Sequence, residues 1–197
     1  MNRIVISVLL AASLSISTAA FAANPASAKS FIDGLAVQVL TLVKSEAVSK
    51  SEKQSRIEAL FADKVDINFV AKFVLGKHWR TATPQQQTAY VAAYKPFILK
   101  NYASKLTKYS GQTYTLKNTR VDGDASVVTM EIDDPDGQKI NVDYRLRDDS
   151  GAFKIVDISV EGVSLLTTQR SEFNAIIENN DMDYLIDRLK KQVAAKG

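Results

Sequence analysis

The chain of 197 residues contains no cysteine, one histidine and four prolines. Without cysteine it has no disulfide framework, no thiolate nucleophile and no cysteine-ligated zinc or iron–sulfur site. A serine–histidine–aspartate triad or a histidine-rich metal site would have to be built on His78 alone. We therefore expect no metal and no cofactor.

The excess of positive over negative charge is also small. The formal net charge is +3 at pH 7, and the basic residues are spread evenly along the chain. A balance this mild does not support nucleic-acid binding. Charged residues make up 24% and hydrophobic residues 46% of the chain, a composition typical of a globular protein.

The first 22 residues have the order of a secretory signal peptide. Arg3 provides the positive start, residues 4–16 are apolar apart from serines, and Ala20-Phe21-Ala22 is an A-x-A cleavage site. Cleavage near Ala22 leaves one domain, residues 23–197. No second apolar run reaches about 18 residues, so we expect no membrane span in that domain. We also expect a monomer.

Apolar residues at helical spacing predict a first helix over residues 30–48. Ser51, followed by Gln54, is typical of a capping box and predicts the start of a second helix. Asp66 is a candidate cap for a short third helix that ends at Gly76.

Thr83, Pro84 and Gln86 form the clearest helix start in the chain, since threonine caps, proline fits the first position and glutamine closes the box. The long helix that follows has an aromatic stripe, which is either ordinary core or the wall of a pocket. Pro96 lies inside this helix and predicts a kink.

From Gln112 the apolar period changes from 3.6 to 2. Three turn signals separate four predicted strands near residues 113–121, 126–133, 139–148 and 153–160. Short turns imply an antiparallel meander. The last strand changes phase, which a β-bulge or a strand covered on both faces explains. Two helices, around Phe173 and Leu185, complete the chain.

This order predicts an α+β fold: a twisted four-stranded antiparallel sheet covered on one face by helices. Such a sheet forms a concave cup, which is filled by side chains or left open for a ligand.

Four polar positions are candidates for catalysis or metal binding. His78 has no evident orienting partner, so a catalytic role is disfavoured. The acidic turn at 133–137 lacks the residue order of a calcium loop and is better explained as a solvated hairpin. Asp157, the single acid in an apolar strand, is a candidate general base, although a hydrogen-bonded aspartate beside a bulge is the favoured interpretation. Ser164 lies outside any G-x-S-x-G motif.

Four segments resemble the toluene-tolerance, or MlaC-like, family. They are the stretches FVLGKHWRTATPQQQ at 73–87, YASKL at 102–106, DISVEGVSL at 157–165 and QRSEF at 169–173. The resemblance covers nearly all of residues 30–195, in the same order, after a signal peptide. His78 replaces a usual aromatic residue, Gln169 replaces a common tyrosine, and Pro96 interrupts the long helix.

The resemblance implies a periplasmic phospholipid carrier without enzymatic activity. It implies a cup similar to nuclear transport factor 2-like folds, with extra helices and with acyl chains between sheet and helices. The implied partners are an outer-membrane lipoprotein complex and an inner-membrane ABC transporter with MCE-domain subunits. Together they would maintain the lipid asymmetry of the outer membrane.

On this basis we predict that aromatic and aliphatic side chains from the helices, the sheet and the C-terminal part of the chain contact the acyl tails. These are Val74, Leu75, Trp79, Tyr94, Phe97, Ile98, Tyr102, Val128, Met130, Ile132, Val142, Tyr144, Leu146, Val160, Val163, Leu165 and Phe173. Arg80 and Arg170 are candidates for the rim, where they would bind a phosphate or form structural ion pairs. The alternative function is an isomerase or dehydratase of the same cup architecture that uses Asp157 and a tyrosine.

Overall fold

The computed structural model describes residues 25–108, 111–149 and 151–195. The predicted signal peptide and its cleavage site near Ala22 lie outside the described residues. Helices and strands follow in the order α1 (Pro25–Lys44), α2 (Lys50–Lys64), α3 (Ile67–Leu75), α4 (Lys77–Thr81), α5 (Pro84–Leu106), β1 (Thr113–Asp122), β2 (Ala125–Asp133), β3 (Lys139–Asp149), β4 (Ala152–Val160), β5 (Val163–Ser164), α6 (Leu165–Asn179) and α7 (Met182–Ala194).

The strands form one antiparallel sheet in the order β1-β2-β3-β4-β5. The α+β class and the four predicted strands are confirmed, but the strand count of four is wrong. β5 has two residues, too few for a period-2 pattern to reveal, and pairs with the end of β4. The likeness to nuclear transport factor 2-like folds stays a prediction.

The predicted bulge in β4 is confirmed. Arg145 pairs with Asp157 and the next residue, Leu146, pairs with Ile155, so Val156 is the extra residue. Both Ile155 and Val156 are buried. The backbone oxygen of Ile155 accepts a hydrogen bond from the Asp66 backbone nitrogen at 3.0 Å. The bulge therefore ties the sheet to the junction between α2 and α3.

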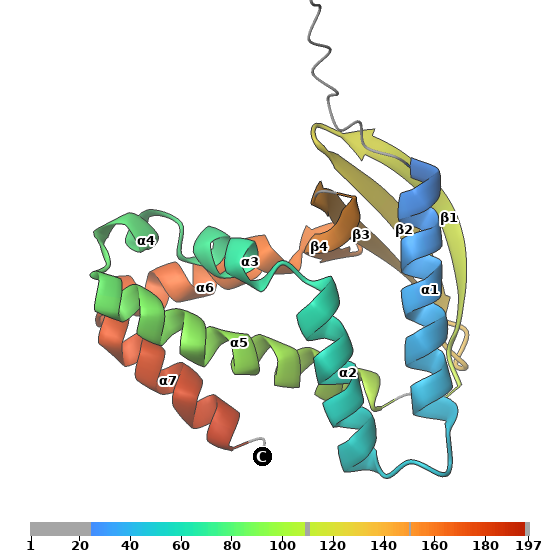
Figure 1. Ribbon diagram of the computed structural model, residues 1–197, viewed down its shortest axis with the longest axis horizontal. Coiled ribbons are helices and arrows are strands. Elements are labelled where there is room, and N and C mark those ends of the chain that lie inside the picture. Colours follow the sequence, from blue (N-terminus) through green and yellow to red (C-terminus); the bar gives the residue numbers. More distant parts are fainter. Residues whose placement is uncertain (1–24, 109–110, 150, 196–197) are drawn as a thin grey trace, which may run out of the picture.

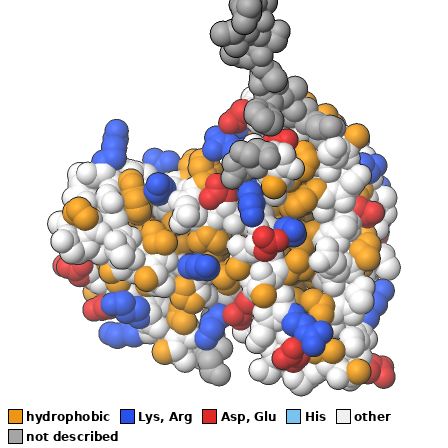
Figure 2. All heavy atoms as spheres, in the orientation of Figure 1, with side chains coloured by type: hydrophobic (Ala, Val, Ile, Leu, Met, Phe, Trp, Pro, Cys, Tyr) orange, Lys and Arg blue, Asp and Glu red, His pale blue; other side chains and the backbone are white. Residues whose placement is uncertain are grey.

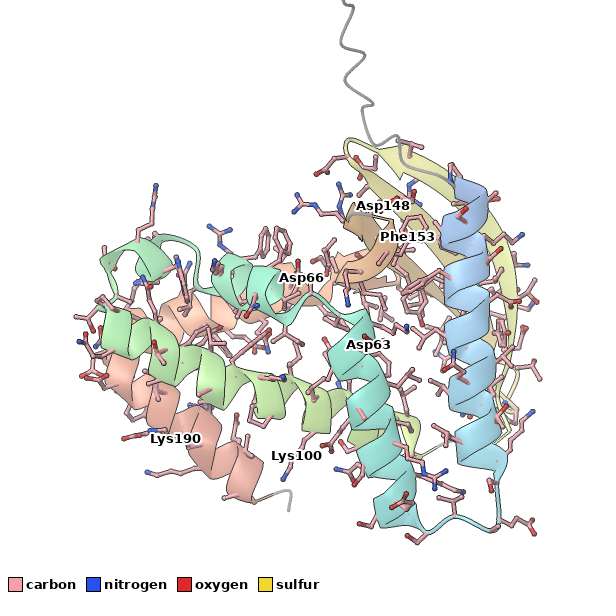
Figure 3. The ribbon with its side chains drawn as sticks, viewed as in Figure 1. Asp63, Asp66, Lys100, Asp148, Phe153 and Lys190 are labelled. Carbon is pink, nitrogen blue, oxygen red and sulfur yellow. The ribbon has the colours of Figure 1, made fainter. Side chains whose placement is uncertain are left out.

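Helix α1 lies along the apolar face of the sheet (Figure 1). Its Ile32 and Leu35 are buried in one cluster with Val128, Leu146 and Ile155 from three strands. The rings of Phe31 and Phe153 lie 5.9 Å apart. Phe153 lies in the space between β4 and α1, near one end of this layer (Figure 3). The sheet is covered because its alternating apolar residues would otherwise face water.

The opposite face of the sheet carries charged side chains that pair across strands. Arg120 contacts Asp143 at 2.9 Å, and Glu131 contacts both Lys117 and Lys139. Solvated pairs of this kind contribute little stability each, but they keep this face polar. The apolar side of the sheet is therefore the side that α1 covers.

The remaining helices build a second core beside the sheet (Figure 1). Tyr90 and Tyr94 of α5 stack 5.3 Å apart, and Phe173 of α6 meets both rings edge-on. This cluster contains Tyr90 and Tyr94 from the aromatic stripe of the long helix, so these two rings pack within the helical core. α5 continues as one helix through Pro96. Lys100 extends from α5 to donate to the Val193 carbonyl at 3.4 Å (Figure 3).

Local capping signals were partly correct. Asp66 accepts from the Phe69 backbone nitrogen, and Thr83 and Gln86 form the predicted reciprocal capping box. The box predicted at Ser51 is wrong, because Ser49 is the cap and accepts from the Glu52 backbone nitrogen. The first helix also begins and ends earlier than predicted, at Pro25 and Lys44.

The expectation that no second segment is long and apolar enough to span a membrane is wrong. By its length and composition alone α1 qualifies, with a mean hydropathy of 1.3. In the structure its apolar side faces the sheet, where Ile32 and Leu35 are buried. Its hydropathy thus reflects a helix that covers apolar surface within the protein.

We expect Ile32→Ala to lower the free energy of unfolding by about 2–5 kcal/mol, because it empties a buried position between α1 and the sheet. Ile32 is 1% exposed, whereas Val37, five residues along the same helix, is 52% exposed. Val37→Ala is the matched control and should change stability by less than about 0.5 kcal/mol. Urea unfolding measures both, and equal effects would contradict the packing of α1 described here.

Candidate functional site

An apolar cavity of about 230 Å³ lies between α1, the sheet and the end of α5. Hydrophobic side chains are visible along the seam between α1 and the neighbouring helices (Figure 2). The cavity is lined by Ile32, Leu35, Ala36, Val39, Leu40, Val43, Phe61, Lys105, Leu106, Lys108, Gln112, Thr113, Tyr114, Met130, Ile132 and Tyr144. Such a lining suits an apolar ligand with one polar end.

The sheet side of the cavity is apolar in spite of its tyrosine. The Tyr144 hydroxyl lies 3.9 Å from the Met130 sulfur, a weak acceptor. Burial raises the pKa of Tyr144 to about 12, so its phenol stays neutral at physiological pH. Met130 adds a flexible, polarisable side chain that adapts to irregular ligands.

A second, small cavity of about 30 Å³ lies between α3, α5 and the bulged strand. It has room for about one water molecule. Phe61 of α2 lines both cavities and therefore stands between them. The small cavity is lined by Phe61, Val65, Ile67, Val70, Ile98, Leu99, Tyr102, Ile155, Val156, Asp157, Ile158, Leu165 and Leu166.

Asp157 is engaged by its own surroundings. One carboxylate oxygen accepts from the Ile158 backbone nitrogen at 2.7 Å, and the other accepts from the Ser164 hydroxyl at 2.7 Å. Ser164 in turn caps α6 by accepting from the Thr167 backbone nitrogen. This matches the favoured interpretation, a hydrogen-bonded aspartate beside a bulge. The carboxylate ties β4 to the start of α6.

A scan against protein-family models matches the MlaC protein model over residues 34–191. The chain belongs to the MlaC family. Curated relatives include the toluene tolerance protein ttg2D of Pseudomonas putida, 27% identical over 134 residues. They also include the intermembrane phospholipid transport system binding protein MlaC of Haemophilus influenzae, 21% identical over 135 residues. Each alignment covers 66% of this chain and a little under two thirds of the relative, 62% and 63%.

A solved structure shares the fold of this MlaC-family chain. It is the phospholipid-binding protein of Ralstonia solanacearum in complex with a phospholipid. The TM-score is 0.71 at 22% identity, and the match covers 89% of this chain and 99% of that protein. The likeness is one of fold and extends over most of the chain.

Six of the residues predicted to contact lipid line the two cavities. Met130, Ile132 and Tyr144 line the apolar cavity, and Ile98, Tyr102 and Leu165 line the small one. The other predicted residues line neither cavity. Those in the helical core or packed on it are Val74, Leu75, Trp79, Tyr94, Phe97 and Phe173, and those on the strands or the β4–β5 turn are Val128, Val142, Leu146, Val160 and Val163. Their contact with lipid stays a prediction.

The two rim candidates also lie away from the cavity linings. Arg80 is exposed at the end of α4. The Arg170 guanidinium lies 5.2 Å from the Phe73 ring and close against Gly76, where a Cβ would come within 2.6 Å of it. The described residues contain no group of three or more histidine or acidic side chains that could hold a metal.

Sequence reasoning missed the contribution of α1 to the cavity wall. Six of its residues line the cavity, all on its apolar face: Ile32, Leu35, Ala36, Val39, Leu40 and Val43. The helical period identified an apolar face here, but a face that packs on protein and a face that lines a cavity have the same pattern. Lys105 and Lys108 were missed as well, since isolated lysines near a helix end carry no specific signal.

Tyr144→Phe tests the environment of the cavity phenol. Because the pKa is raised in the folded state, the neutral phenol contributes stability that is complete below pH 10 and is lost as pH rises toward 12. We expect Tyr144→Phe to match the parent within about 1 kcal/mol at pH 7 and to lose stability less steeply above pH 10. Urea unfolding against pH measures this, with Tyr184→Phe, which is 48% exposed, as the control. Parallel curves for Tyr144→Phe and the parent would contradict a desolvated phenol.

Proposed function

We propose that this chain is a periplasmic phospholipid carrier that encloses acyl chains in the apolar cavity and releases them without breaking a bond. The observation that carries the proposal is the apolar cavity between α1 and the sheet, in a chain of the MlaC family. A curated relative is named as the binding protein of an intermembrane phospholipid transport system, and the Ralstonia protein of the same fold is in complex with a phospholipid.

The energetics of the ligand explain why a carrier needs such a cavity. A phospholipid has roughly 30 methylene groups, and keeping each out of water is worth about 0.8 kcal/mol, or on the order of 25 kcal/mol in total. A soluble carrier must therefore cover the tails almost completely. The charged head group has no such requirement, since water solvates it well. The cavity meets both requirements of such a ligand. Its interior is apolar, and the lining residues that are exposed to solvent are polar.

The position of this carrier in a transport route is part of the same proposal. We infer that it takes lipid from, or gives lipid to, an outer-membrane lipoprotein complex and an inner-membrane ABC transporter with MCE-domain subunits. This exchange would maintain the lipid asymmetry of the outer membrane. The support is membership of the MlaC family, together with the predicted signal peptide that exports the chain.

Ala36→Phe should reduce lipid uptake several-fold, because the added ring points into the apolar cavity from α1 and occupies the space for a tail. The matched control is Val37→Phe, which adds a similar ring one residue along the same helix, on its exposed side. Protein stripped of lipid is incubated with labelled phospholipid vesicles, and bound lipid is counted after separation. Equal uptake by the two variants would show that this cavity does not hold the tails. A parent protein that folds but takes up no lipid would overturn the proposed function.

Phe61→Leu and Phe61→Ala should extend the cavity, because Phe61 stands between the two cavities. We expect lipid retained from vesicles with equal amounts of C14 and C18 chains to shift toward C18, since each additional buried methylene is worth about 0.8 kcal/mol. Mass spectrometry of the retained lipid measures the ratio. Phe61→Ala should also destabilise the protein by about 3–5 kcal/mol, so Phe61→Leu is the safer variant. An unchanged chain-length ratio in both folded variants would show that Phe61 does not limit the cavity.

A further inference from the structure

The solvent-exposed lining residues mark the mouth of the apolar cavity. Among its lining residues, the exposed ones are Lys105, Lys108 and Thr113, while the rest are buried or half-buried. Lys105 lies in the last turn of α5, Lys108 follows the end of that helix, and Thr113 begins β1. The Lys108 backbone nitrogen donates to the Lys105 carbonyl at 3.2 Å, so the two lysines are held one turn apart. Two lysines one turn apart therefore line the exposed part of an apolar space.

Neither lysine is neutralised by an acidic residue in the described part of the chain. Lys105 places its ammonium 6.0 Å from the centre of the Tyr102 ring. Within the described ranges, the lining of the cavity includes no aspartate or glutamate. Two acids contact lining residues: Asp134 accepts from the Gln112 side-chain amide at 3.3 Å, and Asp33 accepts from the Tyr114 hydroxyl at 2.9 Å. Lys77, Lys139 and Lys154, elsewhere on the surface, each contact a carboxylate.

A helix end attracts cations in any protein, because the last carbonyl groups carry partial negative charge. This effect accounts for a lysine in the last turn of α5. It does not account for a second lysine beyond the last helical residue, nor for both side chains lining an apolar cavity. A ligand with long apolar tails and an anionic end fits the whole arrangement.

We propose that Lys105 and Lys108 bind the phosphate of a phospholipid whose tails occupy the apolar cavity, and that the pair favours lipids of net negative charge. The inference rests on the proposed function. Each ammonium group has three donors for the phosphate oxygens, and hydrogen bonds between charged groups are stronger than neutral ones. Because both lysines are exposed, the rest of the head group stays in water.

The test is a competition between two head groups with identical tails. Protein stripped of lipid is incubated with vesicles of equal parts phosphatidylglycerol and phosphatidylcholine, and the bound lipids are quantified by mass spectrometry. We expect the parent to enrich phosphatidylglycerol about three- to tenfold, the size expected for two exposed charge contacts. The enrichment should fall as ionic strength rises.

The variant Lys105→Gln/Lys108→Gln should lose that enrichment, measured as the ratio of the two lipids in the protein-bound fraction. The matched control, Lys95→Gln/Lys191→Gln, removes the same charge from exposed positions on α5 and α7 that line no described cavity, and should keep the enrichment. Urea unfolding of both variants checks that each is folded. Enrichment retained by the first variant, or absent from a parent that binds lipid, would overturn this inference and leave the proposed carrier function intact.

Two further results would also overturn it. Inorganic phosphate titrated into the stripped parent distinguishes a free ion from a lipid head group. Binding of phosphate alone, lost in Lys105→Gln/Lys108→Gln, with no preference between the two lipids would assign the lysines to a free phosphate. Slower extraction from vesicles with an unchanged lipid ratio would assign them to docking on an anionic membrane surface. A parent that takes up neither lipid overturns the proposed function itself.

Discussion

The structure depends on the need to cover the apolar face of a sheet whose other face is wet. Cross-strand ion pairs such as Arg120–Asp143 keep the outer face polar, so the inner face must be covered by helices. α1 covers part of it with Ile32 and Leu35, which reach Val128 and Leu146. Toward the end of α5 the cover is incomplete and the apolar cavity remains. The proposed binding site is thus a region of the sheet that the protein's own side chains do not fill.

Local features of the fold could be predicted from the sequence, because their causes are local. The caps at Asp66 and Thr83 need only a side chain and the next turn of backbone, and the bulge at Val156 is visible as a change of phase. Ser51 followed by Gln54 fits a capping box, and so does Ser49 followed by Glu52, so the motif alone does not identify the cap. The choice of Ser49 also depends on the path of the chain from α1, which a short motif does not specify.

The cavity could be predicted only in part, for a different physical reason. Met130, Ile132 and Tyr144 were assigned to it because they lie on the apolar face of a strand. Tyr94 and Phe173 have the same apolar character, but their rings pack together in the helical core and line neither of the two cavities. Periodicity reports that a residue avoids water, but it does not report whether the neighbour is protein or empty space. That distinction depends on how two separate packing layers meet, which is a property of the whole fold.

The bulge in β4 gives one strand a role in both layers. Ile155 packs beneath α1, Val156 lines the small cavity, and the Ile155 carbonyl holds the Asp66 nitrogen where α3 begins. A change of one residue in the length of β4 would therefore change the attachment of α3 and the pairing of Asp157 at the same time. The number of residues in this strand is therefore constrained, since its extra residue sets the relative position of the two halves.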